Sequence, residues 1–316
     1  MIAQAKEFKK QSRKLSADLR HRGLIRKALG GYYAKRDHNK NMYRDWQAAR
    51  QAAAEVKYEA VNTLDQQLEQ LTSQLEKRGA HVHWASTGKQ ARECIMDICR
   101  SREAKAIVKS KAMTAEEIHL NEALEEAGYE VVESDLGEFI VQLRREAPYH
   151  IVFPAMHLTR DEISDLFHNE LGSAETDDPE ELTMIARRAL RRKYCEADIG
   201  ISGANFAVAE TGMISITENE GNARLTCALP RVHIAIMGIE KIVPRFSDLA
   251  LFLPMLATAG AGQPLTGYNS MYGGPKSDDD PDGPEEFHVV LLDNGRTRLL
   301  ADPEQRDALH CIRCGA

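Results

Sequence analysis

The chain has 316 residues, of which 43% are hydrophobic and 28% charged, as is usual for a globular protein with one large core or two smaller ones. Its longest apolar run, residues 249–259, contains Pro254 and is too short to cross a bilayer, and the charged N-terminal segment has no signal-peptide core. Membrane proteins are thereby excluded, and we expect a cytoplasmic protein. Four cysteines lack the spacing of a disulfide framework, so we expect reduced thiols at Cys94, Cys99, Cys195 and Cys227.

The net charge of −7 hides an asymmetry along the chain. Residues 1–50 hold 14 Lys and Arg against four Asp and Glu, a balance of +10, which leaves −17 for the remainder. An apolar stripe accompanies these charges, so we expect the segment to dock on a partner or on the chain's own acidic body. A solvated helical face is the alternative, and aromatic residues are too sparse here to favour nucleic acid. The stripe consists of Leu24, Ile25, Leu29 and Trp46.

Residues 3–78 are predicted to be helical throughout, because apolar residues recur at three- and four-residue steps and no strand pattern interrupts them. The Gly30-Gly31 pair is predicted to end a first helix. A second helix would then run through Trp46 to Arg78 and end at Gly79, a residue type that favours the helix C-terminus.

After Gly79 the pattern alternates between short apolar strands and amphipathic helices. This rhythm predicts an α/β fold with a mostly parallel sheet flanked by helices, preceded by the helical N-terminal region. The predicted strands are 81–85, 106–108, 129–132, 150–153, several between 199 and 237, and 287–292. The predicted helices are 89–100, 115–127, 136–145, 161–171, 179–195 and 249–257, with a glycine-rich loop at 260–274 and an acidic hinge at 277–284.

Polar residues that follow predicted strands are the candidates for a binding site, because open α/β sheets bind ligands at the carboxyl ends of their strands. Thr87 and Gly88 could supply amide donors at a helix N-terminus. The Lys109-Ser110-Lys111 run could hold a carboxylate or phosphate, and His157 could act as an acid, a base or a hydrogen-bond donor. Solvated lysines and a structural histidine are the alternative interpretation.

The segment 198–216 is the densest in such residues. Asn205, Glu210 and Thr211 are predicted to lie in short turns at strand ends, where Gly203 and Gly212 allow positive φ angles or close approach to a ligand. Alternatively, Asn205 and Glu210 only satisfy buried amides. We expect Thr87, Lys109, His157, Asn205 and Glu210 to converge on one cleft that binds a small anion.

The chain's last residues read Cys311-Ile312-Arg313-Cys314-Gly315-Ala316, the first half of the cysteine run that holds cubane iron–sulfur clusters in bacterial-type ferredoxins. A zinc knuckle, a redox dithiol or a chance pair are the alternatives. Cys311 and Cys314 are two ligands where a cluster needs four, so we expect an incomplete 4Fe-4S ligand set, no stable cluster in this chain as given, and a frayed terminus.

Several motifs together resemble one known family. They are GANFAVAETG at 203–212, LPRVH at 229–233, KSKAM at 109–113, ESDLGE at 133–138, HIVFPAMH at 150–157 and CIRCGA at 311–316. The first two resemble the signature of the LUD domain, named for lactate utilisation. In order and spacing, the whole set is similar to the iron–sulfur subunits of bacterial lactate-utilisation systems.

That resemblance implies a domain of the sugar-phosphate isomerase and CoA-transferase fold type at residues 79–300, after a helical region at 1–78 and before residues 301–316, the start of a ferredoxin-like domain. It implies a cytoplasmic electron-transfer subunit with two 4Fe-4S clusters in the complete protein. Its partners would be a cysteine-rich protein and a second LUD protein, and together they would oxidise L-lactate to pyruvate. A small carboxylate is a further expected ligand.

Two other functions stay open at this point. The LUD domain could itself be a small-molecule isomerase or acyl-transferase that uses Glu210, His157 and Lys109, with Glu210 considered as a nucleophile although the CoA-transferase glutamate motif is absent. It could also be a non-catalytic scaffold whose basic arm holds partner subunits.

Overall fold

The computed structural model describes residues 2–315. Its N-terminal region consists of four helices, α1 (Ile2–Ala17), α2 (Leu19–Lys40), α3 (Trp46–Asn62) and α4 (Leu64–Lys77). The predicted break at Gly30-Gly31 is wrong, because both glycines lie inside α2. Helices α2 and α3 begin instead where an aspartate accepts a hydrogen bond from a backbone amide: Asp18 from His21 at 2.9 Å, and Asp45 from Ala48 at 3.0 Å.

A six-stranded parallel sheet forms the centre of the molecule, as the alternating pattern predicts. In spatial order its strands are β1 (His81–Ala85), β10 (Glu286–Leu292), β7 (Val232–Gly238), β4 (Ile199–Ser202), β2 (Ala106–Lys109) and β3 (Glu130–Glu133). Since every pair is parallel, the carboxyl ends of all six strands lie along the same edge.

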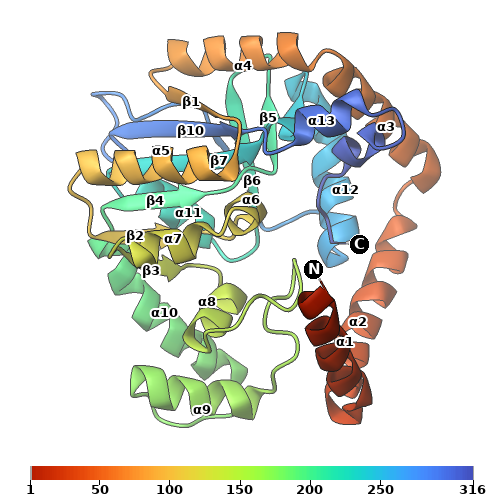
Figure 1. Cartoon of the computed structure of the whole chain (residues 1–316), viewed down its shortest axis with the longest axis vertical. Coiled ribbons are helices and arrows are strands. Elements are labelled where there is room, and N and C mark those ends of the chain that lie inside the picture. The colour runs from red at the N-terminus through yellow and green to blue at the C-terminus, as the bar shows by residue number, and fades with distance from the viewer. Residues whose placement is uncertain (1, 316) are drawn as a thin grey trace.

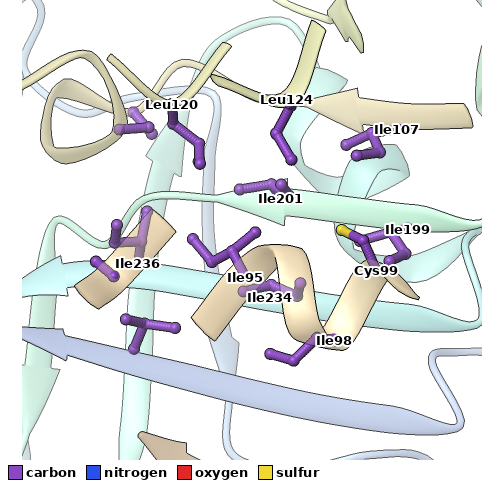
Figure 2. Close-up of a cluster of buried hydrophobic side chains, with 14 of the residues drawn as sticks. Ile95, Ile98, Cys99, Ile107, Leu120, Leu124, Ile199, Ile201, Ile234 and Ile236 are labelled. Carbon is purple, nitrogen blue, oxygen red and sulfur yellow. The ribbon is translucent and has the colours of Figure 1, made fainter. Parts of the chain in front are cut away.

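Both faces of this sheet are buried, because successive side chains of a strand point to opposite faces. On β7, Ile234 and Ile236 pack with α5 (Gly88–Ser101) and α7 (Leu120–Glu126), whereas Ala235 and Met237 belong to the core on the other face. Figure 2 shows the first of these cores, with Ile95 of α5 beside the isoleucines of β4 and β7.

Helix α4 and a second, smaller sheet cover part of the other face. This sheet has the order β8 (Ile242–Val243), β5 (Phe206–Val208), β6 (Met213–Glu218) and β9 (Tyr268–Tyr272). Helix α8 (Leu136–Leu143) packs against β3 and helix α10 (Pro179–Glu196) against β2. Helix α9 (Arg160–Leu171) packs against these two helices at the lower end of the view in Figure 1.

The remaining elements are the helices α6 (Met113–Glu117), α11 (Asn222–Ala228), α12 (Leu249–Ala261) and α13 (Arg296–Ala301), and the 3-10 turns η1 (Ile239–Lys241), η2 (Phe246–Asp248) and η3 (Arg306–His310). The helix predicted at 115–127 is two helices, α6 and α7, separated where His119 adopts a left-handed conformation with φ 52°. Helix α11 and the strand β9 were not predicted.

The predicted strand at 150–153 is absent. Instead, the imidazole Nδ1 of His150 accepts hydrogen bonds from the backbone amides of Val152 (3.1 Å) and Phe153 (3.2 Å). The His150 side chain thus accepts the hydrogen bonds that these amides would donate to a neighbouring strand. Pro154, which has no backbone N–H to donate, follows directly.

None of the helices in the described residues 2–315 is both long enough and apolar enough to span a membrane.

Candidate functional site

A cavity of about 670 Å³ lies at the carboxyl ends of three neighbouring strands of the central sheet. Ser110 and Lys111 follow β2, Asp135 follows β3, and Gly203 to Asn205 follow β4. The outer wall comes from segments distant in sequence, namely Tyr32 and Lys35 of α2, residues of α12 and residues 312–314. The position is where an open α/β sheet offers a ligand site.

Polar side chains form the deep part of this cavity. Ser110, Thr114 and Asn222 each line it and are less than one-tenth exposed. The Asn222 amide donates to the Ser134 hydroxyl at 3.4 Å, and the Ser134 hydroxyl also contacts Thr226 at 3.0 Å. Ser110, which follows β2 directly, is 3% exposed and lines the cavity.

Four cationic side chains surround the cavity: Lys35, Lys111, Lys241 and Arg313. The Lys111 ammonium donates to the carbonyl of Val152 at 3.2 Å. Lys241 is buried, and burial lowers its pKa to about 8 despite the nearby Glu240. Arg313 is the basic residue between the two C-terminal cysteines.

Three carboxylates also line the cavity: Asp135, Glu218 and Glu220. Glu218 accepts from two amides at the start of α11, those of Ala223 (2.6 Å) and Arg224 (2.8 Å). Glu220 accepts from the Leu136 amide at 3.0 Å. Burial, reinforced by the neighbouring Asp135, raises the pKa of Glu220 to about 7, so this carboxyl exchanges a proton near neutrality.

A buried charge cluster lies beside the cavity. Lys109 is 1% exposed, and its ammonium is 2.7 Å from a carboxylate oxygen of Glu133. Burial opposes the charge of Lys109, but the Glu133 ion pair keeps its pKa raised. Burial, Glu116 and Glu133 raise the pKa of Glu138 to about 8, so at neutral pH Glu138 is mostly uncharged.

The segment with the two C-terminal cysteines packs against the body of the protein. The Arg313 guanidinium forms ion pairs with Glu117 (3.0 Å) and Glu240 (3.5 Å), and the Lys241 ammonium donates to the Ile312 carbonyl at 3.4 Å. Ile312 and Cys314 pack against the core formed by α3 and α12. The expectation of a frayed terminus is therefore wrong for the described residues.

The same ion-pair network keeps the carboxylate of Glu117, which Arg313 contacts, in its charged form. Burial alone would raise the pKa of Glu117, but hydrogen bonds from Arg296, Asn294 and Arg313 lower it to about 2. Arg296 is 5% exposed and also contacts Glu240. Glu117 is therefore charged at neutral pH, and its ion pair with Arg313 anchors the terminal segment.

Cys314 lines the cavity and is half-buried, whereas Cys311 is exposed. The backbone N–H of Arg313 donates to the Cys311 sulfur at 3.4 Å. Within residues 2–315, no group of three or more His, Cys, Asp or Glu side chains is arranged to hold a metal ion. The described residues therefore contain two cysteines of a possible cluster site but not a complete set of ligands.

The structure brings together four of the candidate residues, and they line the cavity: Ser110, Lys111, Gly203 and Asn205. The Asn205 side chain also has a structural role, because its oxygen accepts from the Thr217 amide at 2.8 Å. The predicted convergence of five residues on one cleft is wrong, since only Asn205 of those five lies there. Outside the cavity are Thr87, Gly88, Lys109, His157, Glu210, Thr211 and Gly212.

The candidate residues that lie outside the cavity are held there by their position in the fold or by local contacts. Glu210 and Asn205 lie at opposite ends of β5, and Glu210 accepts from the Phe246 amide at 2.8 Å. Thr87 follows β1, separated from β4 by two strands, and caps α5 by accepting from Gln90.

The others are also held by local contacts. His157 contacts Glu146 at 3.0 Å. The Gly88 amide donates to Asn294 at 3.1 Å, and the Thr211 carbonyl accepts from Arg78 at 3.1 Å. Gly212, with φ +68°, packs against α4.

Sequence reasoning missed Asp135, Asn222, Glu220 and Lys241. Asp135 could have been found, because it follows a predicted strand just as Lys111 does. The others could not, since they belong to α11, its preceding loop and the turn after β7, which only the packing of the two sheets brings to this edge.

Residues 68–292 match the family described as LUD domain. The chain is 48% identical over 273 residues to "Lactate utilization protein B" of Shouchella clausii, covering 86% of this chain and 57% of that protein. Proteins of the same description from Bacillus subtilis and Bacillus pumilus are 46% and 44% identical, covering 86% and 99% of this chain. The chain spans 57% to 66% of the length of these relatives.

A crystal structure of a DUF162 family protein from Deinococcus radiodurans aligns with a TM-score of 0.40 at 15% identity, covering 73% of this chain and 98% of that chain.

Proposed function

Since this chain belongs to the LUD-domain family, we propose that it is the LUD part of an iron–sulfur electron-transfer protein that serves lactate utilisation. Similarity to lactate utilization protein B over 86% to 99% of the chain supports this proposal. According to this proposal, the protein acts in the cytoplasm with a cysteine-rich protein and a second LUD protein, and the assembly oxidises L-lactate to pyruvate.

The observation that carries the proposal is the position of the C-terminal cysteines. Cys311 and Cys314 have the spacing of cluster-binding cysteines, and the segment between them is held to the LUD body through Arg313 and Ile312. This segment places Cys314 in the wall of the cavity, which suits a group that exchanges electrons with a bound molecule.

The surroundings of these cysteines suit an iron–sulfur cluster. A cluster with four thiolate ligands would carry net negative charge, and two cationic residues belong to or contact the segment that would hold it: Arg313 lies between the cysteines and the Lys241 ammonium donates to the Ile312 carbonyl. The Arg313 amide already donates to the Cys311 sulfur, a contact that stabilises a metal-bound thiolate. When bound, a 4Fe-4S cluster would supply one-electron redox chemistry, with Cys311 and Cys314 as two of its four ligands.

The alternative of a stand-alone isomerase or acyl-transferase has less support. Glu210, His157 and Lys109 do not line the cavity. Each makes a structural contact instead: Glu210 with the Phe246 amide, His157 with Glu146, and Lys109 with Glu133. A non-catalytic scaffold is compatible with the fold, but it gives no account of a polar cavity walled by a cluster-type cysteine.

The experiment is a chimera in which residues 1–316 are continued by the C-terminal part of the Bacillus subtilis relative, reconstituted anaerobically with iron and sulfide. We expect a brown protein with broad thiolate-to-iron absorption and iron matching two 4Fe-4S clusters, whereas the 316-residue chain alone should retain no stoichiometric iron. Replacing Cys311 and Cys314 by serine in the chimera should remove about half of the iron.

Cys195→Ser is the matched control, because Cys195 is exposed but belongs to α10. This variant should keep its full iron content. A colourless chimera, or a double serine variant with unchanged iron, contradicts the proposal.

A further inference from the structure

We propose that two copies of this chain form a two-fold symmetric dimer, in which the groove between α1 and α2 of one protomer binds the acidic surface of its partner. The acidic surface comprises residues 161–181, which span most of α9 and the start of α10. This inference concerns assembly and does not depend on the function proposed above. It rests on the shape and charge of both surfaces and on their location at the same end of the molecule.

The groove has a volume of about 760 Å³ and lies between α1 and α2. Its lining residues recur at three- and four-residue steps in each helix, so one face of α1 and one face of α2 form it. Phe8, Leu15 and Tyr33 are among the exposed apolar side chains of this lining. A concave and exposed apolar surface of this kind is typical of a site that binds another protein chain.

The charge around the groove is positive. Residues 6–27 hold nine Lys and Arg against two Asp and Glu. Arg22 and Arg26 line the groove, and no Asp or Glu of the described residues does. Within the part of the chain that the structure describes, one of the nine cations forms an ion pair, that of Arg20 with Glu162 at 3.9 Å. The remaining positive charge is therefore available to a negatively charged surface of another molecule.

The acidic surface has the opposite charge. Residues 161–181 hold nine Asp and Glu and no Lys or Arg. A hollow of about 680 Å³ opens on this surface, and its lining includes Glu180, Glu181, Arg188 and the exposed apolar side chain of Met184. The acidic surface therefore offers both negative charge and apolar contacts, which complement those of the groove.

Helix α2, which forms one side of the groove, is fixed to the body of the protein at two positions. The His21 imidazole contacts the Tyr149 hydroxyl at 2.9 Å, and the Tyr32 hydroxyl donates to the Ala259 carbonyl. Because of these contacts, the groove cannot turn over onto the acidic surface of its own chain. The complementary surface has to come from a second molecule.

The groove and the acidic surface lie at the same end of the molecule. The ion pair of Arg20 and Glu162 joins the start of α2 to the start of α9, and Figure 1 shows α1, α2 and α9 at the lower end of the view. A two-fold axis near this end would bring the groove of each protomer onto the acidic surface of the other, so that both contacts form at once and the assembly closes as a dimer. A bilayer fits the groove less well, because a helix that binds lipid presents its apolar side chains on a projecting face rather than in a hollow.

The test measures the mass of the 316-residue chain by sedimentation equilibrium over a range of concentrations. We expect a change from the monomer mass of 35.3 kDa to twice that value, with a dissociation constant in the micromolar range. Since salt screens exposed charges, raising NaCl from about 50 mM to about 500 mM should increase this constant roughly tenfold.

Charge reversal on both surfaces tests the pairing directly. Arg22→Glu with Arg26→Glu reverses the groove, and Glu175→Lys with Glu180→Lys reverses the acidic surface; all four side chains are exposed. Each double variant alone should be monomeric, because like charges meet at both contacts. An equimolar mixture of the two should form a heterodimer, since two reversed surfaces meet at one contact and two unaltered surfaces meet at the other.

The matched control is Lys77→Glu with Lys105→Glu, which changes the net charge as the groove variant does. Both lysines are exposed, and they lie at the end of α4 and before β2, outside both surfaces, so this variant should dimerise with an unchanged dissociation constant. Three results would overturn the inference: a monomer at every concentration up to about 100 µM, a dimer that both reversals leave intact, or a mixture of the reversed variants that stays monomeric. The first result, together with binding to phosphatidylserine vesicles, would assign the groove to a lipid surface instead.

Discussion

At the residue scale, glycines show how closely the backbone is packed around the cavity. A side chain on Gly200 of β4 would place its Cβ 1.9 Å from the carbonyl oxygen of Thr226, a residue of α11. Helix α11 therefore lies directly on β4, and this contact brings Asn222 to the cavity. By contrast, a Cβ added to Gly30, which adopts helical geometry inside α2, would meet no other atom within 4 Å.

Two alanine substitutions should consequently have opposite effects. Gly30→Ala should raise the free energy of unfolding by about 0.5–1 kcal/mol, because alanine loses less backbone entropy in a helix. Gly200→Ala should lower it by about 3 kcal/mol or more, because the helix must move away from the strand. Urea denaturation followed by circular dichroism measures both, and a stabilised Gly200→Ala would contradict the packing described.

At the scale of elements, the two N-terminal helices differ in how they are attached. Helix α2 docks on α12, where the Tyr32 hydroxyl donates to the Ala259 carbonyl and the Asn39 amide donates to the Gly262 carbonyl at 2.7 Å. Helix α1 lies alongside α2 (Figure 1) and leaves Phe8 72% exposed. The expected docking on the chain's own body thus applies to α2, and a role for α1 in partner binding stays a prediction.

Stepwise deletion should separate these roles. Removal of residues 1–17 should change the melting temperature little, because the side chains of residues 5–17 are exposed. Removal of residues 1–40 also deletes Tyr32, whose hydroxyl joins α2 to α12, so it should expose the apolar face of α12 and lower solubility. A 41–316 protein that is as soluble and as stable as the full chain would contradict this account.

At the scale of the whole molecule, buried ionisable groups set the dependence of stability on pH. Burial lowers the pKa of His233 to about 3 and that of His288 to about 4, below the ordinary 6.5. The unfolded chain therefore binds more protons below pH 6.5, and stability falls with decreasing pH. Glu138 and Glu220 act oppositely, because pKa values raised to about 8 and about 7 make the folded state bind more protons above pH 4.5.

These opposing contributions should nearly cancel between pH 4.5 and 6.5, which predicts a plateau of stability there. Stability should fall below pH 4.5, where Glu117, with its pKa of about 2, adds to the loss. It should fall again above pH 6.5 until, near pH 8, Lys57 and Lys241 oppose the decline, because burial lowers the pKa of each to about 8 and the unfolded chain then binds more protons. Urea midpoints measured from pH 3 to pH 9 test this. Glu138→Gln should flatten the alkaline decline, and the exposed Glu125→Gln should not; an alkaline decline unchanged in Glu138→Gln would argue against the assignment.

The sequence by itself determined the α/β class, the parallel sheet and most strand positions, because hydrophobic periodicity reports burial locally. It also identified Ser110, Lys111, Gly203 and Asn205 as strand-end residues, and these do line the cavity. Its errors arose where a particular interaction outweighed the local sequence pattern, which hydrophobic periodicity alone does not report. At 150–153 the His150 side chain accepts hydrogen bonds from backbone amides that a strand would use for pairing. At Gly30-Gly31 the docking of α2 compensates for the low helix propensity of the two glycines.

Only the tertiary structure decided which strand ends face the same cavity. The rule that ligands bind at the carboxyl ends of strands does not say which strand ends are neighbours. In the order β1-β10-β7-β4-β2-β3, two strands separate β1, which Thr87 follows, from β4. Asn205 and Glu210 lie at opposite ends of β5. The same folding brings Lys241 and Glu220 to the site and lays Cys314 along its wall. Contacts between residues more than a hundred positions apart depend on the packing of whole layers, and no local pattern in the chain encodes them.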